Sequence, residues 1–524
     1  MLVVKERKLL LVRSRNPERI TSIMPRAARQ VEIKGKEFTA VSHCIDATRI
    51  LRNLGIDAPS PILSYYDWPR GRDIPEPFEA QLQTAAFLTL HNRAFVLNSI
   101  GTGKTIASLW AYDYLRSIGK CQSVLAVAPL STLVPTWADT IDEHLPHLRY
   151  RVLHGDKTKR LKLLKQPADV YIINHDGLKI ILDDLVKHPT INLVILDELA
   201  EIARNHRTAR WKTTNALINQ KHKRLAAWGL TGTPTPNQPT DAYGQAKLMV
   251  PSAAPPYFSR FRDQVMRQRG QFTWVPRENA TEEVFKLLQP SIRYARDDCI
   301  DLPPTTYVDR HVELTPEQRQ AYDAMQQQLV AEHANAQILA VNEGVKVAKL
   351  VQIACGVAYG SDGTDVVVGA KPRIREVMRL VEESASKTLV FVPFLSALEL
   401  VLSALTRAGF NALPIHSGVT KTQRDETFGR FRHQKDLQVL VCQPDAMSHG
   451  LTLTSASTIV WYAPTMKPGT YEQANGRITR PGQKHNTLIV HIEGTPIERR
   501  IYHRLQTRQK LQGLLLDMVR EQRG

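Results

Sequence analysis

Short apolar runs alternate with longer amphipathic segments across residues 71–255 of the chain. Runs that are apolar at every position, rather than at every second position, indicate strands covered on both faces. Strands that alternate with helices form a parallel sheet, so we expect a first α/β lobe here. Its strands are predicted in AFVLNS (94–99), SVLAVAP (123–129), VYIINH (170–175), LVILDE (193–198) and LAAWGLTG (225–232).

The same pattern returns in residues 351–524 and predicts a second parallel-sheet lobe, closed by an amphipathic helix from Pro496 onward. Residues 256–350 lack the alternation. Within them, Thr315-Pro316-Glu317-Gln318 has the capping threonine, first-turn proline and third-position glutamine of a helix start. We therefore predict helical insertions and the connection between lobes there. The second set of strands is TLVFVP (388–393), ALPIHS (412–417), QVLVCQ (438–443), TIVWYA (458–463) and TLIVHI (487–492).

The first 70 residues form a separate, basic segment that ends in a predicted linker. We interpret residues 1–70 as a small N-terminal domain. The expected fold class is therefore α/β, with two parallel-sheet lobes, helical insertions and this small domain. The residues that indicate the linker are Pro59, Pro61, Pro69, Gly71, Pro75 and Pro77.

The chain is strongly basic, which is unusual for a protein of otherwise ordinary composition. There are 69 Lys and Arg against 51 Asp and Glu, a net charge of +18. Clustered cations neutralise phosphates, so the balance favours a polyanion such as nucleic acid, with a merely basic surface as the alternative. The five cysteines contain no C-x-x-C pair, which does not favour a zinc site. No stretch is apolar enough for a signal peptide or a membrane span, so we expect an intracellular protein of the cytoplasm or nucleoid.

A glycine-rich segment, Asn98 to Thr105, follows a predicted strand and opens a predicted helix, as a phosphate-binding loop requires. Gly101, Thr102 and Gly103 bring backbone N–H groups to phosphate oxygens. Lys104 supplies positive charge, and the Thr105 hydroxyl is a Mg²⁺ ligand. The alternative is a glycine-rich turn that binds nothing. Asn98 is a departure, because it stands where such loops carry glycine or another small residue.

Asp197 and Glu198 end the buried run that begins at Leu193. An acidic pair at the end of a buried strand suits metal and water chemistry: Asp197 as a Mg²⁺ ligand and Glu198 as the group that polarises water. Arg477 and Arg480, three residues apart in the second lobe, suit a phosphate that develops charge. A solvated strand end and a basic surface helix are the respective alternatives.

With these elements in this order, residues 77–512 resemble superfamily-two helicases, and specifically the Swi/Snf-type DNA translocases. The matching segments begin with Pro77 to Leu82, which resembles the Q motif, and with Ala128 to Thr132 followed by Trp137, which resembles motif Ia. The remaining matches are Asp197 to Ala200 (the acidic box), Leu230 to Pro234 (motif III), Leu302 to Pro304, His416 to Gly418, Gly450 to Thr454 (motif V) and Gln473 to Gln483 (motif VI).

The resemblance implies two RecA-like lobes that hydrolyse ATP with Mg²⁺ between them while moving along double-stranded DNA. It assigns adenine reading to Gln81 and coupling to Thr231 and Thr233. It assigns DNA contacts to Ser131, Thr132, Ser417 and Thr452. Ala200 replaces the usual histidine of the box and Thr452 stands where the family often has asparagine, which puts coupling efficiency in doubt.

The compact length is similar to that of phage or bacterial genome-maintenance translocases. Arg26, Arg29 and Lys34 near Ile33 and Phe38, followed by Ile50 to Gly55, resemble the small N-terminal domain of fork-remodelling annealing helicases, which makes residues 1–70 a candidate accessory for binding DNA. A structural cap on the first lobe, with its basic residues solvated, is the alternative. We therefore expect a double-stranded-DNA translocase that remodels junctions, forks or DNA-bound proteins, with double-stranded or branched DNA as partner. A strand-separating DNA or RNA helicase and a degenerate ATPase that acts as a DNA-binding scaffold are the alternatives.

Overall fold

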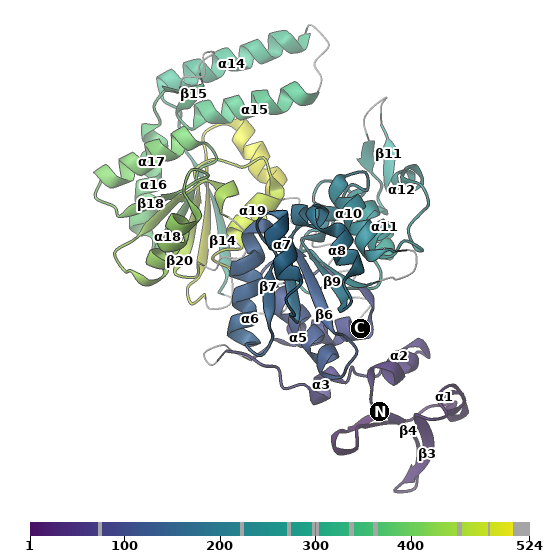
Figure 1. Ribbon diagram of the computed structural model, residues 1–524. Helices are drawn as coiled ribbons and strands as arrows, with labels where there is room; N and C mark the ends of the chain where they lie inside the picture. Colours follow the sequence, from purple (N-terminus) through teal and green to yellow (C-terminus); the bar gives the residue numbers. More distant parts are fainter. Residues whose placement is uncertain are drawn as a thin grey trace. The chain divides into compact units, whose positions relative to one another are not determined.

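The computed structural model describes residues 1–71, 76–220, 225–269, 274–295, 299, 303–334, 340–359, 365–447, 453–479 and 483–506. These residues divide into two compact units, one up to Cys299 and the other from residue 303 to residue 506. Each unit has its own sheet and its own hydrophobic core (Figure 1).

The first unit is built on a seven-stranded sheet in the order β13-β5-β10-β9-β6-β8-β7. Every strand pair in it is parallel. All five runs predicted from the sequence lie in this sheet, whereas the short edge strands β7 and β13 were not predicted. The strands are β5 (Arg93–Val96), β6 (Ser123–Ala128), β7 (Tyr150–Val152), β8 (Val170–Asn174), β9 (Ile191–Asp197), β10 (Ala226–Leu230) and β13 (Ser291–Ile292).

Helices cover both faces of this sheet, which is why its central strands are apolar at every position. Along β6, Val124 and Ala126 join one core cluster while Leu125 and Val127 join the other. One face is covered by α4 (Glu79–Leu90), α5 (Lys104–Ser117) and α6 (Asp139–His144). The other is covered by α7 (Lys157–Leu164), α8 (Leu182–Lys187), α9 (Leu199–Ala203), α10 (Ala209–Ile218), α11 (Asp241–Met249) and α13 (Ala280–Leu287).

The N-terminal residues form a four-stranded antiparallel sheet of order β1-β2-β4-β3 with a small core of its own. They are fastened to the first unit through α4: Arg49 Nε donates to the Leu90 carbonyl at 2.9 Å, and the Ser60 and Thr89 hydroxyls lie 2.8 Å apart. The elements are β1 (Leu2–Val4), β2 (Leu9–Val12), β3 (Ala28–Ile33), β4 (Lys36–Ser42), α1 (Pro17–Ile23), α2 (Ile45–Asn53) and, inside the predicted linker, α3 (Ile62–Tyr65).

The second unit carries a six-stranded parallel sheet of order β14-β21-β20-β17-β19-β18. The expected α/β class with two parallel-sheet lobes is thus confirmed, and residues 496–506 are helical as expected. The strands are β14 (Thr305–His311), β17 (Lys387–Phe391), β18 (Ala412–Ile415), β19 (Val439–Cys442), β20 (Ala456–Trp461) and β21 (Thr487–Glu493). The helices are α14 (Pro316–Ala334), α15 (Ala340–Ala354), α16 (Lys371–Glu383), α17 (Leu395–Arg407), α18 (Lys421–His433) and α19 (Pro468–Asn475), and β15 (Val357–Tyr359) pairs with β16 (Asp365–Val367).

The interval 256–350 contains the expected helices, and the Thr315–Gln318 capping box forms with reciprocal bonds of 3.2 and 3.0 Å. The interval is not wholly helical, however. It also contains β13 and β14, one edge strand of each sheet, and a two-stranded hairpin that follows α12 (Phe258–Val265). The hairpin consists of β11 (Met266–Gln268) and β12 (Trp274–Pro276).

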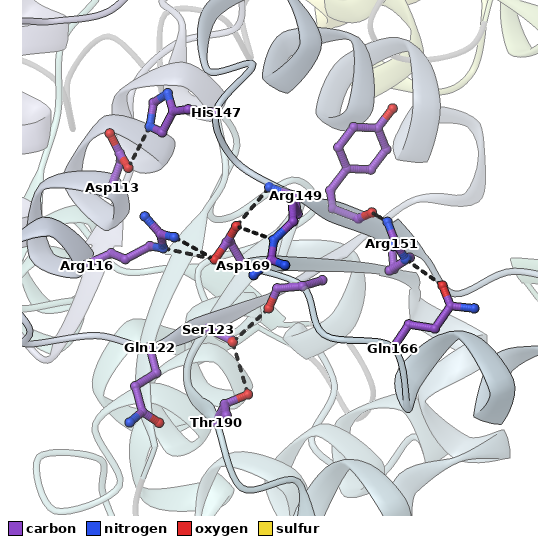
Figure 2. A network of polar contacts seen from close by, with 12 residues as sticks. Asp113, Arg116, Gln122, Ser123, His147, Arg149, Arg151, Gln166, Asp169 and Thr190 are labelled. Carbon is purple, nitrogen blue, oxygen red and sulfur yellow. Dashed lines mark hydrogen bonds and ion pairs between the residues drawn. The ribbon is translucent and has the colours of Figure 1, made fainter.

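The amino ends of β6 and β8 are held by a polar network around Asp169 (Figure 2). Its buried carboxylate accepts from Arg116 Nε at 3.0 Å and from the Arg149 backbone N–H at 2.9 Å. The Ser123 hydroxyl lies 3.0 Å from the Thr190 hydroxyl and so links the start of β6 to the residue before β9. Structural bonds therefore hold this end of the sheet, which lies opposite the edge at which the parallel strands end. Among the described helices, none combines the length and the apolar character needed to cross a bilayer.

A buried ion pair joins α16 to the C-terminal helical residues of the second unit. Arg373 and Glu498 are 2% and 0% exposed, and their side chains meet in two contacts of 2.8 Å. Glu498 also accepts from the Gly494 N–H at 2.9 Å and from the Thr495 hydroxyl at 3.0 Å. Because both charges have left water, removing one leaves the other uncompensated.

We expect Arg373→Met to lower the free energy of unfolding of the second unit by about 3–5 kcal/mol. The double variant Arg373→Met/Glu498→Leu should recover most of that loss, because no buried charge is left unpaired. The measurement is the hydrogen-exchange rate of the β20 and β21 backbone amides in the full chain, followed as the urea concentration is raised. Arg379→Ala, which breaks an exposed pair with Glu376, is the control and should change little. A double variant no more stable than Arg373→Met contradicts this account.

Candidate functional site

The residues predicted to bind phosphate follow β5 at the edge where the parallel strands of the first sheet end. The loop runs from Leu97 to Gly103, and α5 begins at Lys104. Gly101 and Gly103 adopt φ of 87° and 78°, a left-handed conformation that is costly for residues with a Cβ. The loop therefore bends as phosphate-binding loops do, with a helix N-terminus behind it.

Gln81, the predicted adenine reader, lies directly against this loop. A Cβ placed on Gly103 would come within 2.1 Å of Gln81 Nε2, so only glycine allows the approach. The same side chain is oriented by its own helix, because Gln81 Oε1 accepts from the Phe78 backbone N–H at 3.1 Å. The structure thus brings Gln81 and Gly103 together from segments 22 positions apart in the chain.

Lys104 and its neighbours complete the loop. The Lys104 ammonium donates to the carbonyls of Asn98 and Ser99 at 3.0 and 3.1 Å, so it lies across the loop's interior. The buried Thr102 hydroxyl donates to the Ser99 carbonyl at 2.9 Å, which stiffens the turn, whereas Thr105 is partly exposed. These backbone acceptors are weaker partners for an ammonium than phosphate oxygens.

Asn98, the departure noted in the sequence, has a structural role. Its side chain is 2% exposed and points away from the loop. Its Nδ2 donates to the Thr84 hydroxyl on α4 at 2.8 Å, and its Oδ1 accepts from the Tyr294 N–H at 3.0 Å. Asn98 therefore fastens the loop to α4 and to the residues after β13, which explains why a larger residue is accommodated there.

Asp197 ends β9 with its carboxylate buried at 8% exposure. The Trp137 indole Nε1 donates to Asp197 Oδ2 at 3.0 Å, and the Glu198 N–H donates to Oδ1 at 3.1 Å. Burial raises the pKa of Asp197, while the Trp137 bond and the nearby Lys104 charge oppose that rise. β10 lies between β5 and β9, so the phosphate loop and the acidic pair lie at the same edge of the sheet, on either side of β10.

Glu198 has φ 49° and ψ 53°, a left-handed conformation at the start of α9. For a residue with a Cβ this costs on the order of 1–3 kcal/mol and is found mostly at functional sites. Behind the pair, the buried His175 ring bonds to the Asp197 carbonyl at 3.0 Å, and burial lowers the pKa of His175 to about 4. A neutral imidazole therefore supports the strand end.

The predicted coupling residues lie beside the phosphate loop. The Thr231 N–H donates to the Val96 carbonyl at 3.0 Å, and the Thr233 N–H donates to the Thr231 hydroxyl at 3.2 Å. A Cβ on Gly232 would meet Ile100 Cγ1 at 3.1 Å. The phosphate loop and the Thr231–Thr233 segment are therefore in contact.

The residues predicted to contact DNA differ in how exposed they are. Ser131 and Thr132 form a 3-10 turn after β6, but the Thr132 side chain is 3% exposed and donates to the Pro129 carbonyl at 3.0 Å. Ser131 is half-exposed and Ser417, in the second unit, is exposed. Thr452 lies outside the described residues. In this conformation Ser131 and Ser417 are accessible to a phosphate, and the Thr132 hydroxyl is not.

Arg477 is buried in the second unit at 1% exposure, and its Nη2 donates to the Met447 carbonyl at 3.3 Å. The segment around it is fixed by Trp461, whose indole donates to Asn475 Oδ1 at 2.9 Å. Gln483 Nε2 donates to the Ala456 carbonyl at 2.8 Å. Arg480 lies outside the described residues. Asn475 and Gln483, on either side of the predicted arginines, therefore bond to β20 and hold this segment in place.

Residues 88–354 match the family described as the SNF2-related domain, and residues 372–482 match the helicase conserved C-terminal domain. The first match covers just over half of the chain. The chain belongs to the SNF2-related family. This is a family of helicase-like, DNA-dependent ATPases, and the two parallel-sheet units are its two RecA-like lobes.

Among similar proteins, "Putative protein p41" of Acyrthosiphon pisum secondary endosymbiont phage 1 is 26% identical over 82% of this chain and 95% of its own length. The SWI/SNF-related regulator of chromatin subfamily A-like protein 1 of Xenopus tropicalis is 25% identical over 85% of this chain, and the ATP-dependent DNA helicase DDM1 of Arabidopsis thaliana is 22% identical over 80%. The chain spans about half the length of these two eukaryotic relatives, 45% and 58% respectively. The Sulfolobus solfataricus SWI2/SNF2 ATPase core in complex with dsDNA is 20% identical, with a TM-score of 0.41 over 83% of this chain and 92% of that one.

The donor set of the SNF2-related lobe fits Mg²⁺ held together with a nucleotide. Within the described residues, no group of three or more His, Cys, Asp or Glu side chains forms a cluster that could hold a metal ion. Mg²⁺ at phosphate sites takes one or two protein oxygens and completes its shell with phosphates and water. The Asp197 carboxylate and the Thr105 hydroxyl are of that kind, so they could hold the ion without a protein cage.

Two residues gained a role that sequence reasoning did not assign. In the sequence, Trp137 was assigned only to the segment that resembles motif Ia, whereas in the structure its indole donates to the Asp197 carboxylate. Asn98 was noted as a departure and proves to be an anchor. A buried tryptophan after a strand is usually core, so no pattern in the chain distinguishes this one.

We expect Lys104→Ala and Glu198→Gln both to abolish ATP hydrolysis, for different reasons. The first removes the ammonium that faces phosphate and should weaken nucleotide binding. The second keeps the shape of the site but loses water activation, so nucleotide should still bind. Binding of a fluorescent ATP analogue and phosphate release are measured for both. Lys157→Ala, an exposed lysine on α7, is the control, and normal hydrolysis in either site variant disproves the assignment.

Proposed function

We propose that this chain is an ATP-driven translocase on double-stranded DNA. The observation that carries the proposal is the arrangement of Lys104, Asp197, Trp137 and Glu198 at one edge of the first sheet, in a chain of the SNF2-related family. An intact phosphate loop and acidic pair speak against a degenerate ATPase that acts only as a scaffold.

Hydrolysis in this proposal uses groups whose positions are known. The backbone N–H groups around Gly101 and Gly103 and the Lys104 ammonium bind the phosphates. Glu198 orients the attacking water and accepts its proton. Asp197 and Thr105 would hold Mg²⁺, which would supply positive charge against the negative charge that develops on the phosphates. Gln81, adjacent to Gly103, reads the adenine edge.

The arginines of the second lobe are the proposed cations for the γ-phosphate. Arg477 donates to the Met447 carbonyl, so it must exchange this bond for a phosphate oxygen if it acts directly. We propose Arg480 as the arginine that contacts the γ-phosphate during hydrolysis. Such a cation contributes roughly 10³–10⁵ in rate in other phosphoryl-transfer enzymes. Thr231 and Thr233 are proposed to carry the change at the phosphate loop to the DNA-binding side.

DNA as the track is supported by charge and by relatives. The chain carries +18, and backbone phosphates are the natural partner of such an excess. The Arabidopsis relative is named an ATP-dependent DNA helicase. We propose Ser131, Thr132, Ser417 and Thr452 as contacts to one strand. Thr132 can act only through its backbone, or after its side chain leaves the Pro129 carbonyl.

Branched DNA is the finer part of the proposal, and the N-terminal sheet is its support. Arg29 on β3, Lys34 in the turn between β3 and β4, and Lys36 on β4 are exposed. Arg26, in the turn before β3, is exposed as well. A basic sheet fastened to α4 could hold one arm of a junction while the lobes track another. The remodelling of junctions, forks or DNA-bound proteins is proposed on this ground.

We expect linear duplex DNA to stimulate ATP hydrolysis strongly, and single-stranded DNA or RNA to stimulate it weakly. The protein should displace the third strand of a triplex and unwind a plain forked duplex poorly, because a translocase follows one strand without separating the pair. The measurements are phosphate release with each nucleic acid, triplex displacement and fork unwinding, with Glu198→Gln as the inactive control. Efficient unwinding without triplex displacement would favour the strand-separating alternative, and no stimulation by any nucleic acid would favour the scaffold.

A further inference from the structure

A compact group of arginines surrounds the hairpin β11–β12 on the first unit. We call the described residues from Phe258 to Arg269 and from Trp274 to Glu278 the arginine hairpin. It contains five arginines against Asp263 and Glu278, a local excess of three positive charges. The arginines are Arg260, Arg262, Arg267, Arg269 and Arg277.

Two of these arginines make structural contacts within the hairpin and are not available to bind a ligand. The Arg262 guanidinium lies 3.9 Å from the centre of the Trp274 ring and 2.9 Å from the Asp263 carboxylate. Arg277 Nε donates to the carbonyls of Asp263 and Met266 at 2.9 and 3.0 Å. Stacking and backbone bonds of this kind fix the strands against α12.

The other three are exposed, and within the described part of the chain they have no ion pair. Met266, on β11, is 3% exposed and belongs to the core, so its neighbour Arg267 must point to the opposite, solvent face. Arg269 directly follows the end of β11 at Gln268 and is also exposed.

The hairpin is rigidly attached to the ATP-binding unit. The Tyr243 ring on α11 packs against Phe258 and Phe261 on α12, with centroids 5.5 and 6.0 Å away. α11 also contacts the residues that follow the Thr231–Thr233 segment, because the Asp241 carboxylate accepts from the Asn237 N–H at 2.8 Å. A grip on DNA at the hairpin would therefore move with the lobe that binds ATP.

We propose that the arginine hairpin is a second DNA-binding site, in which Arg267 and Arg269 contact backbone phosphates of the duplex outside the contacts proposed for Ser131 and Ser417. This proposal rests on the proposed function for its choice of DNA as the polyanion. The site reads no base, since guanidinium contacts to phosphates position a duplex without reading its sequence. It adds affinity and salt dependence while leaving the chemistry of hydrolysis unchanged.

The test is the salt dependence of duplex binding by the full chain, measured by anisotropy of a labelled 30-base-pair duplex. Arg267→Gln/Arg269→Gln should weaken binding roughly tenfold or more near 0.1 M salt and reduce the slope of log affinity against log salt by about 1.8, or 0.9 per lost phosphate contact. The maximal ATPase rate at saturating duplex should not change. Arg267→Lys/Arg269→Lys should keep most of the slope, which a merely structural role would not predict.

Lys165→Gln/Lys187→Gln is the matched control, with the same change of charge on the same unit. Both lysines line a cavity of about 970 Å³ near the amino ends of the strands, beside the network of Figure 2. An equal loss in this control would mean that only net charge matters, and an unchanged slope in the hairpin variant would mean that no phosphates are bound there; either result overturns the proposal. Absence of duplex-stimulated ATPase in the unaltered chain would instead remove the translocase function, while the anisotropy slopes would still decide the hairpin.

Discussion

The burial of one carboxylate constrains the whole catalytic edge of the first lobe. Asp197 is 8% exposed, and a buried charge is stable only where donors and cations compensate for the lost water. The compensation comes from three directions: the Trp137 indole after β6, the Glu198 N–H after β9 and the Lys104 charge after β5. These contacts hold the three loops around the Asp197 carboxylate. The left-handed backbone of Glu198 is a local cost at the end of β9.

The order of the strands makes this convergence possible. β10 lies between β5 and β9, so the phosphate loop and the acidic pair flank the segment that contains Thr231. All of these strands are parallel, and their ends therefore meet at one edge. Gln81 and Asn98 add connections to α4, on which the N-terminal sheet also rests. Nucleotide binding, the coupling segment and the N-terminal basic sheet thus share one rigid lobe.

The sequence predicted the central strands because they follow a local rule, whereas the roles of the candidate site residues stay predictions. A strand buried on both faces must be apolar at every position, and a phosphate loop needs glycine where φ is positive. The edge strands β7, β13 and β14 escaped prediction, since two of them are only two or three residues long and β14 has exposed positions. The hairpin β11–β12 escaped for the same reason. The partners of Trp137, Asn98 and Thr132 could not be predicted, because each is fixed by packing between segments far apart in the chain.

The Trp137 bond to Asp197 is the part of this account most open to direct test. The measurement is the maximal DNA-stimulated ATPase rate of Trp137→Phe, beside Trp228→Phe, in which another buried indole loses its bond to the His91 carbonyl. If compensation of the Asp197 charge organises the site, Trp137→Phe should lose at least about tenfold in rate, some 1.4 kcal/mol in barrier. Trp228→Phe should keep its rate at a similar loss of thermal stability. Wild-type turnover in Trp137→Phe, or an equal fall in both variants, would contradict the account.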